Sequence, residues 1–242
     1  KSEYNKGEIN DDKIMAVAIE EENKIVALMD ALDTKINTQN KIIKDLKIYR
    51  NVIYDRLVSC LRTEQVSIKN LITSNFVRMI KPSELKPFPG NKKYLSTSSI
   101  DDEGITSIES LITYKERPSR ASMYPINHSV WFAKMKNSIK VLKSNSEIQN
   151  DFVLSTGFYG ILCDENKVSS DWLLETFRSD SFNAQKDRYS EGSSMSGIKD
   201  SQLEDITIAI FNNRNDEEKA VRLLLSLSSL IATNNALLTK YK

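Results

Sequence analysis

The sequence has few of the residues that most enzyme and metal sites need. Its 242 residues include one histidine, His128, and two cysteines, Cys60 and Cys163. The cysteines form no CxxC or Cys/His pattern, which argues against both a zinc site and a disulfide framework. A single histidine has no histidine partner for acid–base or metal chemistry, so we expect it in a loop or at a strand edge. These features predict a reducing, cytoplasmic location.

Catalytic motifs are lacking as well. The chain contains no GxGxxG, GxxxxGK[ST], HExxH or GxSxG sequence, and no [DNS]PP[YFW] sequence of the kind found in amino-methyltransferases. It has no Pro-Asp pair, which the carboxylate metal site of PD…ExK nucleases requires. We therefore predict a protein with no catalytic chemistry of its own and no cofactor.

Long hydrophobic runs and an excess of one charge are also lacking. We expect no apolar run of about 18 residues, the length that spans a bilayer. The polar N-terminal sequence does not resemble a signal peptide. Lysine and arginine number 34 against 33 aspartates and glutamates, which leaves a net charge of +1. The sequence therefore predicts no membrane association, and any affinity for nucleic acid must come from local patches.

Proline and glycine are missing from two stretches that flank a richer middle region. In the first stretch, residues 20–61, apolar residues such as Ile25 and Met29 recur at alternating spacings of four and three. This heptad pattern predicts a long amphipathic helix whose seam is interrupted by Gln39 and Arg50. Polar residues inside such a seam commonly set the register and the number of partners.

An internal repeat relates the two flanking stretches. The segment from Glu21 to Lys47 aligns without a gap with the segment from Asp216 to Lys242. Identical pairs include Val26 and Val221, Leu28 and Leu223, Leu32 and Leu227, Ile36 and Ile231, Thr38 and Thr233, and Asn40 and Asn235. Just upstream, DDKIMAV (11–17) resembles EDITIAI (204–210), so each helix is expected to follow an exit strand. We predict that the helices pair; a helical hairpin that only completes a core is the alternative.

The chain therefore divides into four predicted segments. These are an exit strand and tail of a preceding unit (1–19), a long coiled-coil helix (20–62), a globular domain (63–212) and a second coiled-coil helix (213–242). Within the domain we expect a helix at 170–178 and strands at 93–96, 108–113, 129–132, 152–154, 158–162 and 206–210. The predicted fold class is α+β, with one mixed α/β domain flanked by two long helices that pair as an antiparallel coiled-coil stalk.

Positive charge is concentrated in one segment. Between Lys115 and Lys143 there are seven basic residues and a single acid, Glu116, which gives a local charge of +6. Serine and asparagine side chains lie among them, and these can hydrogen-bond phosphates or base edges. A solvated basic face without a ligand is the alternative interpretation.

Five segments follow one another along the middle of the chain: KYLSTSSI (93–100), RPSRA (117–121), WFAKMKNSIKVL (131–142), VLSTGFYGIL (153–162) and YSEGSSMSGIKDSQLEDITIAI (189–210). In this order they resemble the successive motifs of a target-recognition domain of Type I restriction-modification specificity subunits. The two repeated helices are similar to the repeated regions of that family. Subunits of the family carry two recognition domains, each reading half of a bipartite site, and this chain would contain one domain with both helices.

The resemblance implies a non-catalytic, sequence-specific subunit that binds double-stranded DNA. Its implied partners are methyltransferase (modification) subunits and an endonuclease (restriction) subunit, and a homodimer through the helices would restore two-fold symmetry. A coiled-coil structural adaptor is the alternative, and it should show no salt-dependent DNA binding. A lone nuclease or methyltransferase would need the motifs that the chain lacks.

Polar and basic residues in the matching motifs are the predicted DNA contacts. The first group comprises Arg117, Ser119, Arg120, Lys134, Lys136 and Lys140. The second group comprises Ser96, Thr97, Ser155, Thr156, Arg188 and Ser193. For the serines and threonines of the second group, capping of a turn is the alternative role.

Overall fold

The computed structural model describes residues 18–190 and 197–241, which form two compact units. The helical unit consists of described residues up to Asp45 together with those from Thr233 onward. The globular unit runs from Leu46 to Ala232. The exit strand expected at 11–17 lies outside the described residues. The predicted segment boundaries stay predictions, because the division between the two units cuts across both long helices.

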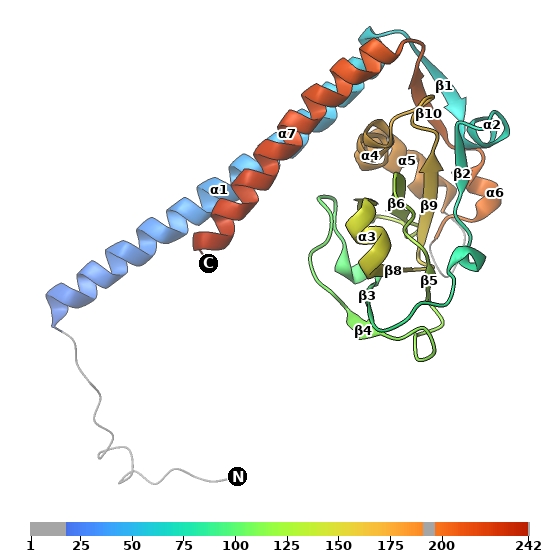
Figure 1. Cartoon of the computed structure of the whole chain (residues 1–242). Coiled ribbons are helices and arrows are strands. Elements are labelled where there is room, and N and C mark those ends of the chain that lie inside the picture. Colours follow the sequence, from blue (N-terminus) through green and yellow to red (C-terminus); the bar gives the residue numbers. More distant parts are fainter. Residues whose placement is uncertain (1–17, 191–196, 242) are drawn as a thin grey trace. The chain divides into compact units, whose positions relative to one another are not determined.

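Two long helices, α1 (Ile19–Cys60) and α7 (Arg214–Tyr241), pack against each other (Figure 1). In the helical unit the Lys35 ammonium lies 4.4 Å from the centre of the Tyr241 ring. In the globular unit Arg50 donates a hydrogen bond to Ser228. Because the α1 numbers rise while the α7 numbers fall, the helices are antiparallel. The predicted fold class, an α+β domain between two paired long helices, is confirmed.

A two-stranded ribbon explains why the helices meet. β1 (Thr63–Ser67) follows α1 directly, and β10 (Thr207–Phe211) directly precedes α7. The two strands pair antiparallel, with Thr63 opposite Phe211, and the Asn212 amide donates to the Arg62 carbonyl at 3.1 Å. An antiparallel ribbon places the end of one helix beside the start of the other, so pairing of the helices follows from pairing of the strands.

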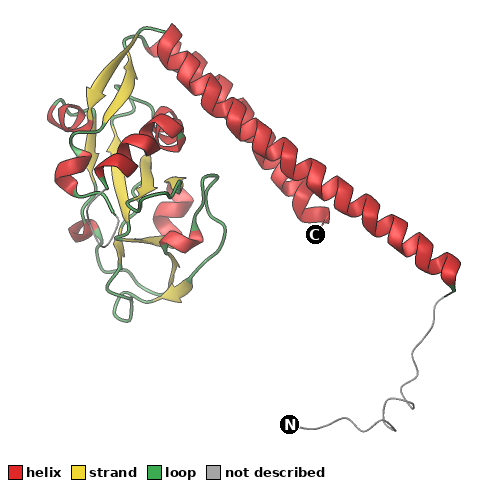
Figure 2. Cartoon of the chain, turned by 180° about the vertical axis from the view of Figure 1, so that it is seen from behind, coloured by secondary structure: helices red, strands yellow, loops and turns green. Residues whose placement is uncertain are grey.

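Two four-stranded sheets build the rest of the globular unit (Figure 2). The first has the order β2 (Val77–Met79), β9 (Phe158–Cys163), β6 (Ser129–Ala133) and β7 (Val141–Lys143), all antiparallel. The second has the order β4 (Ser110–Ile112), β3 (Lys92–Leu95), β8 (Phe152–Ser155) and β5 (Ala121–Met123), and only its β3–β8 pair is parallel. The short helices are α2 (Ile68–Thr73), α3 (Ser146–Asp151), α4 (Ser170–Arg178), α5 (Asp180–Tyr189), α6 (Asp200–Leu203), η1 (Pro82–Glu84) and η2 (Thr97–Ser99).

Strand β6 lies at the centre of the core because both of its faces are covered. Phe132 packs in the cluster that also contains residues of α4, α5 and α7, whereas Trp131 packs in the cluster shared with the second sheet. Gly160 lies opposite Trp131 on β9, and a Cβ there would come within 2.4 Å of the indole ring. The all-buried pattern of β6 thus reflects a strand with no solvent-facing side.

The two polar residues that interrupt the seam have different partners. Gln39 donates through Nε2 to Asn234 Oδ1 at 2.5 Å, a neutral pair between the two helices. Arg50 donates to both carboxylate oxygens of Glu103, at 2.9 and 3.1 Å, and its side chain is only 6% exposed. Burial lowers the pKa of this guanidinium, but the Glu103 hydrogen bond and the nearby carboxylates outweigh burial and raise it overall.

Most expected elements are present, and the unexpected ones are short. The helix expected at 170–178 is α4, and each of the six expected strands overlaps an observed one. The strands β1, β2, β5 and β7 were not expected, nor were the helices α2, α3, α5 and α6. Elements this short carry too little of a repeating pattern to be recognised in sequence.

Helix α7 corrects one expectation about hydrophobic runs. It is long enough, and apolar enough over an 18-residue window, to cross a membrane by length and composition alone. The sequence was expected to hold no apolar run of this length. In the structure Leu224 and Ile231 of this helix are fully buried.

Candidate nucleic-acid interface

The β8–β9 turn brings several predicted contacts together. Ser155 ends β8, and its Oγ accepts a hydrogen bond from the Gly157 amide at 3.1 Å. A Cβ on Gly157 would lie 2.7 Å from Thr97 Cγ2, so only glycine lets the turn approach η2 this closely. Ser155, Thr156 and Thr97 therefore share one surface, although Ser155 is only 4% exposed and its hydroxyl stabilises the turn.

The same turn joins the segments that carry Arg120 and Lys134. The Thr156 amide donates to the Arg120 carbonyl at 2.9 Å, and the Lys134 amide donates to the Gly157 carbonyl at 2.9 Å. The Arg120 side chain is exposed, and among the described residues it has no hydrogen-bond or ion-pair partner. Three motifs that are separate in the sequence thus converge on three consecutive turn residues.

Lys140 and Ser96 lie next to this turn, and both are engaged within the protein. Lys140 Nζ donates to the Thr97 carbonyl at 2.5 Å. Ser96 Oγ donates to Glu109 Oε2 at 2.8 Å and lies 2.6 Å from Ser98 Oγ. These hydrogen bonds of Ser96 favour a turn-stabilising role over a DNA contact.

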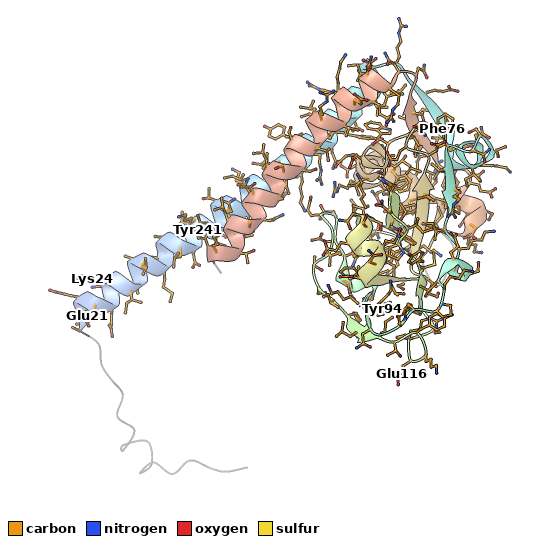
Figure 3. The ribbon with its side chains drawn as sticks, viewed as in Figure 1. Glu21, Lys24, Phe76, Tyr94, Glu116 and Tyr241 are labelled. Carbon is orange, nitrogen blue, oxygen red and sulfur yellow. The ribbon has the colours of Figure 1, made fainter. Side chains whose placement is uncertain are left out.

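Arg117 and Ser119 belong to the loop that leads to Arg120. The Arg117 guanidinium lies 4.0 Å from the centre of the Tyr114 ring and donates a hydrogen bond to the Tyr114 carbonyl at 2.5 Å. Both contacts are within its own loop. Ser119 is exposed. Figure 3 labels Glu116 of this loop near Tyr94 of β3, at the same end of the globular unit.

Lys134 is partly enclosed beside an aromatic ring. Its ammonium lies 4.2 Å from the centre of the Tyr159 ring, and burial lowers its pKa while the charge of Asp200 raises it. Tyr159 donates through its hydroxyl to Asp200 Oδ1 at 2.6 Å and to the Ile198 carbonyl at 3.0 Å. Burial and the neighbouring Asp200 carboxylate both raise the pKa of Tyr159, so the phenol stays protonated. Lys136, two residues on, is partly exposed.

Helix α5 supports the loop that holds these lysines. Lys186 is 1% exposed and donates through Nζ to the Ser138 carbonyl at 2.6 Å. Asp187 accepts a hydrogen bond from the Asn137 amide at 3.0 Å. Burial lowers the pKa of Lys186 to about 8, and Asp187 opposes this only in part. Arg188 is exposed beside these two residues, whereas Ser193 lies outside the described residues.

The segment with a local charge of +6 does not form one uniform strip. Lys143, at its end, forms an ion pair of 2.6 Å with Asp171 of α4, and both side chains are about one third exposed. Its charge is therefore balanced inside the protein. Arg120 and Lys134, in contrast, have no carboxylate within ion-pair distance among the described residues.

The described residues contain no group of three or more His, Cys, Asp and Glu side chains that could hold a metal ion. His128 precedes β6 with a positive φ of 63°, and its Nδ1 lies 3.4 Å from Glu165 Oε1. This places the single histidine at a strand edge, as expected. Cys60 and Cys163 are free, and burial raises the pKa of the Cys163 thiol.

Sequence reasoning missed three residues that shape this surface. Gly157, Tyr159 and Lys186 were not singled out, although the first two lie inside the motif at 153–162. The turn signal Ser-Thr-Gly between two apolar runs predicts a hairpin, so Gly157 could have been identified from the sequence. Lys186 gives no such signal, because a buried lysine looks like any helical lysine in sequence.

Comparison with known proteins gives matches among solved structures only. No family model matches the chain, and no curated protein sequence does. The HsdS subunit from Thermoanaerobacter tengcongensis is similar with a TM-score of 0.50 and 20% identity over 75% of this chain and 43% of that one. The Type I restriction-modification S subunit from M. genitalium is similar with a TM-score of 0.59 and 9% identity over 93% and 58%.

A third match comes from a study of complex assembly and conformational transition of the Type I restriction-modification system. Its TM-score is 0.48, with 11% identity over 93% of this chain and 57% of that one. The chain spans about half the length of the structures that it matches. The resemblance noted in the sequence is thus confirmed for the fold: the chain has an architecture similar to about half of a Type I specificity subunit.

Proposed function

We propose that this chain is a sequence-specific DNA-binding subunit of a Type I restriction-modification system, acting in the cytoplasm. It reads one half of a bipartite target in double-stranded DNA and has no catalytic activity of its own. The observation that carries the proposal is the fold shared with a Type I S subunit over 93% of the chain.

The charges of the turn surface support DNA as the ligand. The β8–β9 turn holds Arg120 and Lys134 together, and neither forms an ion pair with a carboxylate among the described residues. Phosphate groups supply the missing negative charge, and releasing their counterions makes such binding strongly salt-dependent. Thr156, Ser119 and Thr97 add hydroxyl groups of the kind that contact phosphates or base edges.

The two long helices support docking of protein partners. In the helical unit Ile25, Val26, Leu28 and Met29 of α1 are each more than half exposed. Exposed apolar stripes of this kind mark protein interfaces. We assign them to methyltransferase subunits, with the endonuclease subunit joining that assembly, and to a second copy of the chain. The mass of the chain alone and mixed with methyltransferase subunits tests both assignments.

Selection from random-sequence duplexes tests the function directly. The chain, assembled with methyltransferase subunits from the same source, is expected to enrich a bipartite motif with a fixed spacer. Enrichment should weaken as salt rises, because phosphate contacts release counterions. Assembly without any salt-dependent DNA binding would favour the structural adaptor instead.

A further inference from the structure

A cavity of about 230 Å³ lies beside the turn surface, inside the globular unit. Its wall is mostly apolar and includes Ile72, Met79, Met123 and Leu203. Exposed residues such as Lys81 also line it, so it reaches the surface. Pockets for drug-sized ligands measure about 300–1,000 Å³, so this cavity suits a ligand smaller than most drugs.

The polar groups of this cavity come from the turn surface and from α6 with its C-cap. Lys134 and Thr156 line it on one side, and Asp200 and Glu204 line it on another. The Lys134 ammonium is partly enclosed and has no hydrogen-bond or ion-pair partner among the described residues; its neighbour is the Tyr159 ring. The closest acid, Asp200, already accepts the Tyr159 hydroxyl at 2.6 Å. Asp200 therefore lies near Lys134 without pairing with it, and the Lys134 ammonium keeps its hydrogen-bond donors for an anionic group of a ligand.

We propose that this cavity binds one nucleotide, with the base between Met79 and Met123 and a phosphate at Lys134. Methionine thioethers make favourable contacts with aromatic rings and adapt to their shape. Thr156 and Glu204 offer a hydroxyl and a carboxylate to the polar edge of the base, as pockets for extruded bases do.

The nucleotide has two sources with the same chemistry. It is either extruded from DNA that lies on the turn surface, in which case the inference rests on the proposed function, or it is a free mononucleotide. Because the cavity touches Arg120 through Thr156 and contains Lys134 itself, a strand bound at the surface passes its entrance.

Methyl NMR of the full chain labelled at methionine tests this directly. Adenosine 5′-monophosphate is the first probe. A duplex with one unpaired adenine, compared with its fully paired counterpart, is the second. We expect shifts of the Met79 and Met123 methyl signals with the mononucleotide, with the unpaired duplex, or with both, and no shift of Met29 on α1. The pattern identifies the source of the nucleotide.

Two variants make the assignment specific. Lys134→Met should weaken binding of the mononucleotide at least about tenfold, because it removes a charge-assisted contact. Ile72→Trp should fill the cavity and abolish the methyl shifts. Lys219→Met, which removes an exposed lysine of α7, is the matched control and should change nothing.

The outcomes separate this inference from the proposed function. If duplexes bind but Met79 and Met123 do not respond to any probe, the nucleotide pocket is wrong and DNA binding stands. If the mononucleotide shifts both methyls while no duplex binds, the pocket stands and the proposed function is wrong. Equal binding of the mononucleotide by Lys134→Met and the unmodified chain would overturn the role of Lys134.

Discussion

Lysines and arginines at the base of the helix pair have carboxylate partners, whereas three at the turn surface have none in the described part of the chain. At the base, Arg50 binds Glu103 in a bidentate pair, and Lys47 lies 2.7 Å from Asp102. Arg178, on α4, completes the cluster with a 2.6 Å pair to Glu175. Every cation of this cluster has a carboxylate of the protein beside it.

At the turn surface three cations, Arg120, Lys134 and Lys140, have no carboxylate partner among the described residues. Lys140 donates to a backbone carbonyl, and Lys134 lies over a tyrosine ring. Arg120 has no side-chain partner among the described residues. Charge that is balanced internally stabilises a fold, whereas charge that is left unbalanced is available to an external anion. On the proposed function, we therefore expect the arginines and lysines without a neighbouring carboxylate to be the ones that contact DNA.

The largest expected effect lies at the balanced cluster. Arg50→Ala removes the cation that Glu103 shares with the 2% exposed Glu175, while Lys47 stays 3.5 Å from Glu103 and Arg178 stays 2.6 Å from Glu175. Breaking a buried ion pair from one side costs about 3–5 kcal/mol, so the free energy of unfolding should fall by up to that amount. Denaturant titration measures it. Lys219→Ala, at an exposed pair, is the control and should stay within about 1 kcal/mol. Equal losses for the two variants would contradict the comparison.

A smaller effect on stability is expected at the turn surface, where the change should appear in DNA binding. Lys134→Ala combined with Lys136→Ala should weaken DNA binding by the assembled enzyme and lower its salt slope by about 2, close to one per phosphate contact. The free energy of unfolding should change little. Arg62→Ala with Lys69→Ala removes two exposed charges elsewhere in the globular unit and serves as the control. Unchanged affinity and slope would remove the lysines from the contact surface.

Lys186 sharpens the comparison because it is a buried cation with no ion-pair partner among residues 18–190 and 197–241. Its pKa is lowered by burial to about 8 in the folded chain, against 10.5 for the ordinary side chain. Between these values the unfolded chain binds more protons, so stability rises with pH across that window. The unmodified chain should therefore gain stability relative to Lys186→Met from about pH 8 to 10.5. Parallel curves for both proteins, measured by denaturant titration, would show that Lys186 does not titrate there.

The helices and the order of elements could be predicted from sequence because they repeat a simple pattern. Heptad spacing marks α1, and the repeat marks α7. The surface could be predicted only in part. Arg120 and Lys134 were named from motifs, but their convergence depends on long-range backbone bonds to Thr156 and Gly157, which no local pattern encodes. The charge cluster was equally hidden, since Arg50 looked like a register residue in a seam while its partner Glu103 lies in a distant loop.

The hydrogen bond between Gln39 and Asn234 joins equivalent positions of the two repeat copies. The two residues are 195 positions apart, which is the spacing of the internal repeat, so they occupy the same place in their two copies. In an antiparallel pair, equivalent places face each other only on a local axis of two-fold rotation. The helical unit is therefore palindromic about this contact. Exchanging the two copies along the chain would preserve the register, so a circular permutation that swaps their order should assemble the same helix pair.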